Sequence, residues 1–124
     1  MLFTIADESN EVDLPIVAKS DGEPITTGTV NFYLKALSGT NKGKWYKGST
    51  AAWGAAIEIA GAATHDVDGH WYLELVSAVW TKGVRYKLIA RESGDLHIAV
   101  ERSILCVDIT DLKGIAWELM QSKA

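Results

Sequence analysis

The segment between His65 and His70 carries the densest set of side chains that could do chemistry. Its sequence is H-D-V-D-G-H, so two carboxylates stand two positions apart between two imidazoles. Carboxylates and imidazoles in such proximity are common ligands of divalent cations. The D-x-D-G run lacks the rest of a calcium loop, and Asp-Gly is a strong turn signal. The segment therefore favours a solvated β-turn, with a metal site at Asp66 and Asp68 as the alternative.

Other combinations that could support catalysis are sparse. Cys106 could act as a thiol nucleophile with His97 as its base, but nine positions of extended strand would separate the two side chains by about 30 Å. Four glutamates are expected at outward strand positions, where a solvated charge is the default: Glu58, Glu74, Glu92 and Glu101. The sequence therefore predicts a protein that is not an enzyme, with no catalytic residue, bound metal or cofactor.

Composition narrows the class of protein further. The 124 residues are 48% hydrophobic and 23% charged, which fits one globular domain with a sizeable core. A net charge of −4 without a basic stripe argues against nucleic-acid binding. No apolar run approaches a membrane span, and the first ten residues do not resemble a signal peptide. The single cysteine, Cys106, is expected as a buried strand thiol.

A two-residue rhythm dominates the first 107 residues. In 28–37, for example, Val30, Phe32 and Leu34 alternate with polar or amphipathic side chains. Pro15 lacks an amide donor, so its strand is expected at a sheet edge. We expect a core position for Trp45 and a bulge near Arg102, where the alternation slips. The strand segments are expected at 12–19, 28–37, 44–47, 56–59, 62–65, 71–76, 84–91 and 96–107.

This spacing of short strands and turns predicts an all-β fold, an immunoglobulin-like antiparallel β-sandwich of about seven strands over residues 1–107. Residues 108–124 form a separate tail whose apolar positions recur with helical spacing. A helix this short needs a surface to pack on, either its own sandwich or a neighbouring chain. The expected partner-binding residues of this amphipathic tail are Ile109, Leu112, Ala116, Trp117, Leu119 and Met120.

Exposed aromatic side chains provide a second candidate surface. The chain has five tryptophans and four tyrosines. Aromatic rings on outward strand positions can stack on sugars, or they can cover cross-strand neighbours and subunit contacts. The expected glycan platform consists of Tyr33, Tyr46, Trp53 and Tyr72.

One motif is specific to the immunoglobulin-like fold. In W-x-x-G-x-x-Y-x-L, Tyr86 stands near the start of a strand that follows the expected sandwich corner at Trp80. A tyrosine at that position hydrogen-bonds back to the corner, which is the tyrosine corner of such domains. Leu88 replaces the second cysteine of an antibody domain.

The chain also resembles a family. The segments D-L-P-I-V-A-K-S-D-G-x-P-I-T-x-G-T-V-N-F-Y-L, G-K-W-Y-K-G and A-A-T-H-D-x-D-G-H-W, with the tyrosine-corner motif, are similar to immunoglobulin-like domains of tailed-bacteriophage and prophage structural proteins. The resemblance covers roughly residues 14–107. It implies a structural or assembly protein of the baseplate, tail-fibre or capsid-associated type, made in the host cytoplasm and located in the virion. Its partners are then other virion proteins or further copies of itself, and a carbohydrate-binding adhesion module is the alternative.

Overall fold

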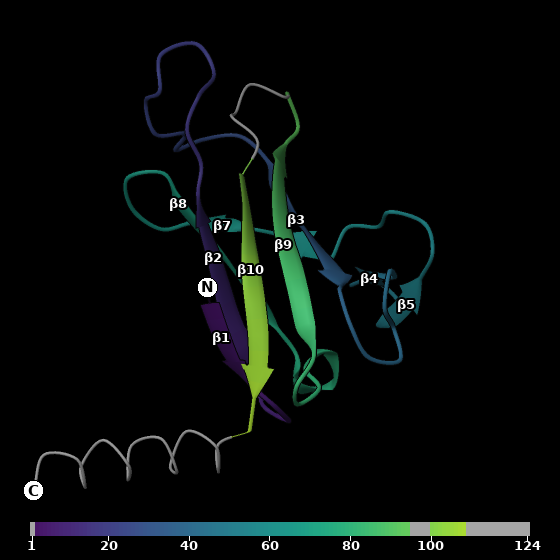
Figure 1. Ribbon diagram of the computed structural model, residues 1–124. Coiled ribbons are helices and arrows are strands. Elements are labelled where there is room, and N and C mark those ends of the chain that lie inside the picture. Colours follow the sequence, from purple (N-terminus) through teal and green to yellow (C-terminus); the bar gives the residue numbers. More distant parts are fainter. Residues whose placement is uncertain (1, 95–99, 109–124) are drawn as a thin grey trace, which may run out of the picture.

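The computed structural model describes residues 2–94 and 100–108, which form two β-sheets packed against each other (Figure 1). The small sheet has three strands: β2 (Asn10–Pro15), β7 (Thr64–His65) and β8 (His70–Leu75). The large sheet has seven strands: β1 (Leu2–Ile5), β3 (Val30–Ala36), β4 (Trp45–Lys47), β5 (Ala52–Gly54), β6 (Gly61–Ala62), β9 (Arg85–Glu92) and β10 (Val100–Val107). The predicted all-β sandwich is confirmed, although the described residues form ten strands where about seven were predicted.

The strand order of the large sheet is β1-β10-β9-β3-β4-β5, with β6 also paired to β3, and that of the small sheet is β2-β8-β7. The chain therefore passes repeatedly between the two layers. Among the described strands every pairing is antiparallel except that of β1 with β10, which is parallel. The large sheet is therefore mixed, and the prediction of antiparallel strands throughout is wrong at this one pair. Pro15 ends β2, an edge strand, as its missing amide donor predicts.

In the described residues the helical structure is one short turn, η1 (Ser77–Val79), which links β8 to β9. No described helix has the length and apolar character that crossing a bilayer requires.

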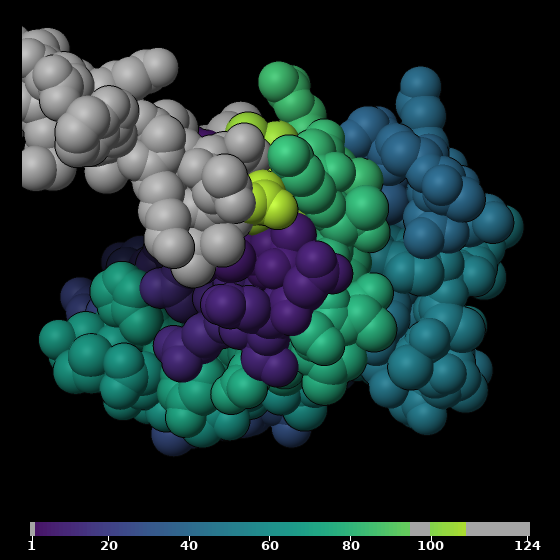
Figure 2. Space-filling model, turned by 90° about the horizontal axis from the view of Figure 1, so that it is seen from below, coloured from purple at the N-terminus to yellow at the C-terminus, as the bar shows by residue number. Residues whose placement is uncertain are grey.

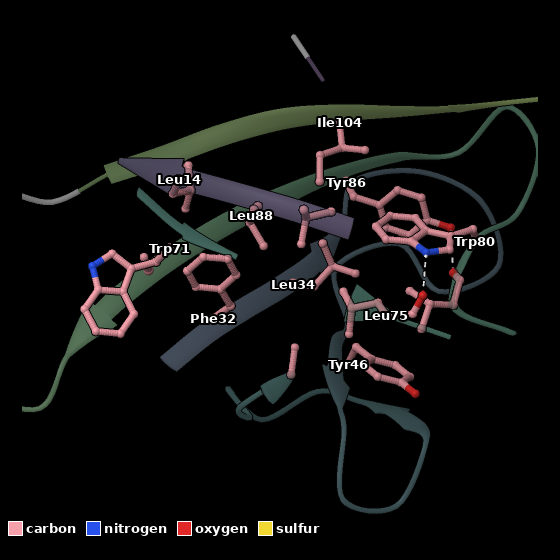
Figure 3. Packing of buried hydrophobic residues seen from close by; sticks show 14 of the residues in the cluster. Leu14, Phe32, Leu34, Tyr46, Trp71, Leu75, Trp80, Tyr86, Leu88 and Ile104 are labelled. Atoms are coloured by element: carbon pink, nitrogen blue, oxygen red, sulfur yellow. Dashed lines mark hydrogen bonds between the residues drawn. The ribbon is translucent and has the colours of Figure 1, made fainter. Parts of the chain in front are cut away.

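The hydrophobic core lies between the sheets and follows the alternation of the strands (Figure 3). Phe32 and Leu34 of β3 and Leu88 of β9 are fully buried, and Leu14 of β2 meets them from the small sheet. Each of these side chains projects from the inward face of its strand, because successive side chains point to opposite sides of a sheet. The alternation predicted for β3 is confirmed.

The predicted core position of Trp45 is wrong. Trp45 is partly exposed, whereas the next residue, Tyr46, is only 4% exposed. Trp45 pairs across the ladder with Lys35, which occupies an outward position of β3. A three-residue strand is too short to show its phase in the sequence, so the partner strand decides which of its neighbours faces inward.

The middle of the chain also differs from expectation. Residues 56–59 do not form a strand, and a strand at Ala52–Gly54 pairs with β4 instead. The segment after it is positioned by close contact between backbones, since the amide of Gly48 donates to the carbonyl of Ile59 at 3.1 Å. A side chain at Gly48 would overlap the carbonyl oxygen of Ala60. A sequence rich in alanine and glycine has little periodicity, so the packing of this segment against the backbone at Gly48 could not be predicted.

The bulge predicted near Arg102 is absent. The ladder between β10 and β9 continues without interruption from Val100 to Leu105. Arg102 takes a register position opposite the buried Leu88, yet its guanidinium leaves the core at the sandwich margin. There Nη1 lies 2.8 Å from Oδ1 of Asp13 on β2, an ion pair that joins the two sheets. The sequence irregularity therefore reflects this pair, together with the outward apolar side chains of Leu105 and Val107, rather than an extra residue.

Several expectations concern residues outside the described ranges. The start of the last predicted strand, with His97, falls in 95–99. The boundary predicted between sandwich and tail coincides with the end of the described chain at Asp108. The predicted helix and its six partner-binding residues also lie outside the described residues: Ile109, Leu112, Ala116, Trp117, Leu119 and Met120.

The crossing from β8 to β9 contains the predicted tyrosine corner. Trp80 is 2% exposed and closes one end of the core (Figure 3). The centroid of its ring lies 5.1 Å from that of Tyr86. The Tyr86 hydroxyl donates to the carbonyl of Val79 and accepts from the amide of Thr81, both at 3.0 Å. Burial raises the pKa of Tyr86, and the hydrogen bonds with Thr81 oppose that rise.

Removing this hydroxyl is expected to destabilise the fold. Tyr86→Phe leaves the carbonyl of Val79 and the amide of Thr81 without their partner, so we expect the free energy of unfolding to fall by about 2 kcal/mol. Urea denaturation measures the loss. Tyr72→Phe is the matched control, because its phenol is partly exposed, and it should change stability by less than about 0.5 kcal/mol.

Candidate protein-interaction surfaces

The segment His65–His70 forms a hairpin turn. Asp68 and Gly69 both have positive φ, 51° and 80°, and the amide of His70 donates to the carbonyl of Val67 at 2.9 Å. These are the features of a type I′ turn. Nε2 of His65 accepts from the amide of Gly69 at 3.2 Å, so this imidazole stabilises the turn. Within residues 2–94 and 100–108, no three His, Cys, Asp or Glu side chains form a group that could hold a metal ion.

The predicted glycan platform is not one surface. Tyr46 is buried, so its predicted outward position is wrong. The ring of Trp53 contacts that of Tyr46, with 5.3 Å between centroids, and also that of Tyr86, with 6.0 Å between centroids. Tyr46 and Trp53 therefore belong to the end of the core. Tyr33 and Tyr72 are partly exposed, but they lie on different sheets and therefore on opposite faces of the sandwich.

Tyr33 instead belongs to a cluster on the outward face of the large sheet. Its ring contacts that of Trp45 edge-on, with 6.5 Å between centroids. Cζ of Arg91 lies 5.2 Å from the Tyr33 centroid, and Nζ of Lys35 lies 5.5 Å from that of Trp45. Each ring thus carries a cation over one face, where the π electrons attract it. Sequence reasoning missed this cluster because it placed Trp45 in the core.

More cations surround these rings. Lys87 is the direct cross-strand partner of Lys35, and Arg85 follows at the next outward position of β9. We call the outward side chains Tyr33, Lys35, Trp45, Arg85, Lys87 and Arg91 the basic face. The acidic neighbour on this side is Glu101 of β10, whose carboxylate lies 3.7 Å from Nζ of Lys87.

The small sheet carries the opposite charge. Its three strands contain no lysine or arginine, and Glu11, Asp13 and Glu74 occupy outward positions. Glu11 and Glu74 are direct cross-strand partners. We call these three side chains the acidic face. Of the three, Asp13 has a cationic partner among the described residues, Arg102.

A third exposed surface is apolar and lies along β1. Phe3 is 58% exposed and pairs with Leu105 of β10, while Ile5 pairs with Val107. All four side chains point away from the core, because Thr4 and Cys106 between them are buried. Figure 2 shows the purple N-terminal atoms at the surface beside the yellow-green atoms of β10. We call Phe3, Ile5, Leu105 and Val107 the apolar edge.

A cleft of about 600 Å³ lies between the β2–β3 loop and the end of β9. It is lined by residues 18–20 and 24–28 together with Glu92. The ionisable side chains among them are Lys19 and Glu92. The lining contains neither histidine nor cysteine.

Cys106 is fully buried beside Thr4 of β1. Burial raises the pKa of its thiol above the ordinary value, and Thr4 lowers it in part. The folded protein therefore favours the neutral thiol, whereas the unfolded chain releases the proton at the ordinary pKa of about 8.5. The stabilisation that comes from keeping the Cys106 thiol neutral in the folded protein is fully present below about pH 8.5. It is lost as the pH rises through the raised pKa of the thiol in the folded protein.

We therefore expect the melting temperature to fall more steeply between about pH 8 and 10 in the wild type than in Cys106→Val, which keeps a buried group without a proton to lose. Thermal unfolding at a series of pH values measures this difference. Equal slopes in the two proteins would show that the thiol does not contribute.

Comparison with known proteins finds no match: no family model fits the sequence, and no curated protein or solved structure matches it. The class of protein therefore follows from the fold and its surfaces. It is a β-sandwich with one basic face, one acidic face and an apolar edge.

Proposed function

We propose that this chain is a non-enzymatic structural or assembly protein of a phage-like particle and that it acts through protein–protein contacts. The observation that carries this proposal is the apolar edge. Phe3 is 58% exposed on an edge strand, next to three further outward apolar side chains. This is more contiguous apolar surface than a sheet face in contact with water usually carries. Edge strands also leave backbone groups free to pair with another chain.

An immunoglobulin-like fold of the variable type belongs to the same proposal. In that fold the C, F and G strands are extended by C′ and C″, and the opposite sheet contains B, E and D. The orders β10-β9-β3-β4-β5 and β2-β8-β7 support this assignment, because they follow the order of these two sheets, with β1 and β6 as additional strands. The hydrogen bonds of Tyr86 to the preceding corner support the assignment. Such sandwiches serve as binding modules in many protein assemblies.

The apolar edge adjoins the place where the tail begins. Val107 ends β10, and the predicted amphipathic tail follows from residue 108. The proposal therefore assigns the apolar edge and the predicted tail, which are neighbours in the sequence, to the same partner. This continuity favours one extended contact surface over two separate ones.

Particle incorporation tests the proposal. In particles purified from cells that carry the gene in its native context, we expect a tagged wild-type chain at a fixed copy number. A chain truncated after Val107 and the variant Phe3→Glu should each be lost from the particle while their circular dichroism stays that of a folded β protein. Val67→Glu is the matched control, because Val67 is 55% exposed but lies on the β7–β8 turn.

Two results would contradict the proposal. The wild-type chain could be absent from purified particles, or both altered chains could be incorporated as efficiently as the control. In the second case the apolar edge and the tail are not the attachment surface.

A further inference from the structure

We infer that copies of this chain stack head to tail, with the basic face of one copy against the acidic face of the next. The inference rests on the proposed function and names the partner as a second copy of this chain. It is carried by the segregation of charge between the two sheets of one small sandwich.

Both faces place like charges directly opposite each other. On the large sheet Lys35 and Lys87 are cross-strand partners, and on the small sheet Glu11 and Glu74 are cross-strand partners. Like charges in this arrangement destabilise an isolated sheet. Contact with a surface of opposite sign would relieve the repulsion on both sides at once.

The surrounding charges reinforce this complementarity. On the basic face, Arg85 and Arg91 are exposed and add to the two lysines, whereas Glu101 supplies one compensating carboxylate. On the acidic face, neither Glu11 nor Glu74 forms an ion pair within the described part of the chain. The basic face thus carries positive charge in a chain whose net charge is −4.

The geometry of the two faces determines the type of assembly. They belong to opposite layers of the sandwich, so a contact between them joins different surfaces of the two copies. Contacts of this kind continue from copy to copy and produce rings or open stacks rather than closed dimers.

The size of the acidic face sets the expected strength. β2 and β8 have six residues each and β7 has two. The small sheet therefore covers at most about 14 Å by 20 Å, which is less than the roughly 800 Å² per partner of a standard interface. The contact is therefore weak between isolated copies. It becomes effective where a particle holds many copies at high local concentration.

A polyanion is the competing occupant of the basic face. An acidic polysaccharide would satisfy Lys35, Lys87 and Arg91, and Trp45 would lie within its reach. It would leave the repulsion between Glu11 and Glu74 unchanged, however. A second copy accounts for both faces, which is why we favour it.

Sedimentation equilibrium of the purified full chain tests the inference. We expect concentration-dependent association at about 20 mM NaCl that weakens at least fivefold at about 500 mM NaCl, where charges are screened within about 4 Å. Two double variants sharpen the test: Glu11→Lys with Glu74→Lys makes both faces basic, and Lys35→Glu with Lys87→Glu makes both faces acidic. Each variant alone should remain monomeric, and an equimolar mixture of the two should associate.

Folding controls accompany the mixture. Glu11→Lys with Glu74→Lys keeps a like-charge pair across the same two strands, so its melting temperature should stay close to that of the wild type. Lys35→Glu with Lys87→Glu also keeps such a pair but loses the exposed Lys87–Glu101 ion pair, so it should melt at a slightly lower temperature. The single variant Glu74→Lys places opposite charges across β2 and β8. It should melt at a higher temperature and yet associate less, which separates loss of the interface from loss of the fold.

The inference is overturned if the wild type stays monomeric at millimolar concentration in low salt and the mixed variants do not associate. It is also overturned if Phe3→Glu abolishes association while the charge variants retain it, because the apolar edge is then the contact. Binding of polygalacturonate to the wild type without self-association would assign the basic face to a polyanion. In each of these cases incorporation into particles remains a separate measurement, so the proposed function can stand or fail independently.

Discussion

Trp80→Ala is expected to lower the free energy of unfolding by about 4 kcal/mol, the middle of the range for truncating a buried aromatic side chain. Trp80 is 2% exposed and fills the end of the core between η1 and β9. Its ring contacts Tyr86, whose hydroxyl holds the same crossing. The substitution therefore leaves a large cavity beside the buried hydrogen bonds of the tyrosine corner. Urea denaturation followed by circular dichroism measures the loss.

Two further variants separate the contribution of Trp80 from that of any tryptophan. Trp45→Ala removes a ring of the same size from a partly exposed position, and we expect it to cost about 1 kcal/mol or less. Trp80→Phe keeps an aromatic ring against Tyr86 and should recover at least half of the loss. Equal effects of Trp80→Ala and Trp45→Ala would refute the assignment of Trp80 to the core.

Gly48→Ala is expected to be the most damaging single-methyl change, with a loss of about 3 kcal/mol. The added carbon would overlap the carbonyl oxygen of Ala60, and this obstacle is backbone rather than a flexible side chain. The segment cannot simply move away, because the amide of Ala60 donates to the carbonyl of Phe32 in β3 at 2.8 Å. The substitution must therefore shift β4 or detach the segment that precedes β6.

Gly54→Ala provides the matched control. Gly54 lies in β5 of the same hairpin, and beyond its two chain neighbours a Cβ at this position would have no atom within 4 Å. We expect this variant to change stability by less than about 0.5 kcal/mol. Hydrogen exchange at the Ala60 amide gives a local readout, because exchange should accelerate in Gly48→Ala and stay slow in Gly54→Ala. Comparable stability of the two variants would show that the close approach is absent.

Alternating side chains were enough to predict the layers of the fold. Phe32 and Leu88 are buried as their alternation requires, and the Asp68–Gly69 turn and the hydrogen-bonded Tyr86 occur where the sequence indicates. These features depend on neighbours a few positions apart, so the local sequence carries them. The alternation did not predict which of Trp45 and Tyr46 is buried. In a strand of three residues, pairing with the neighbouring strand determines which side chain faces the core.

The surfaces, in contrast, depend on which strands become neighbours. Lys35 and Lys87 are 52 positions apart and Glu11 and Glu74 are 63 positions apart, yet each pair meets across a ladder. Phe3 belongs to an exposed edge because β1 pairs in parallel with β10 at the other end of the chain.

The sequence alone determined that this protein is a β-sandwich with a buried tyrosine corner, because alternation and turn chemistry are local properties. Only the tertiary structure decided that charges of opposite sign lie on opposite faces and that exposed apolar side chains lie together along β1. Register and strand order fix these positions, and both arise from contacts between residues that are far apart in the chain.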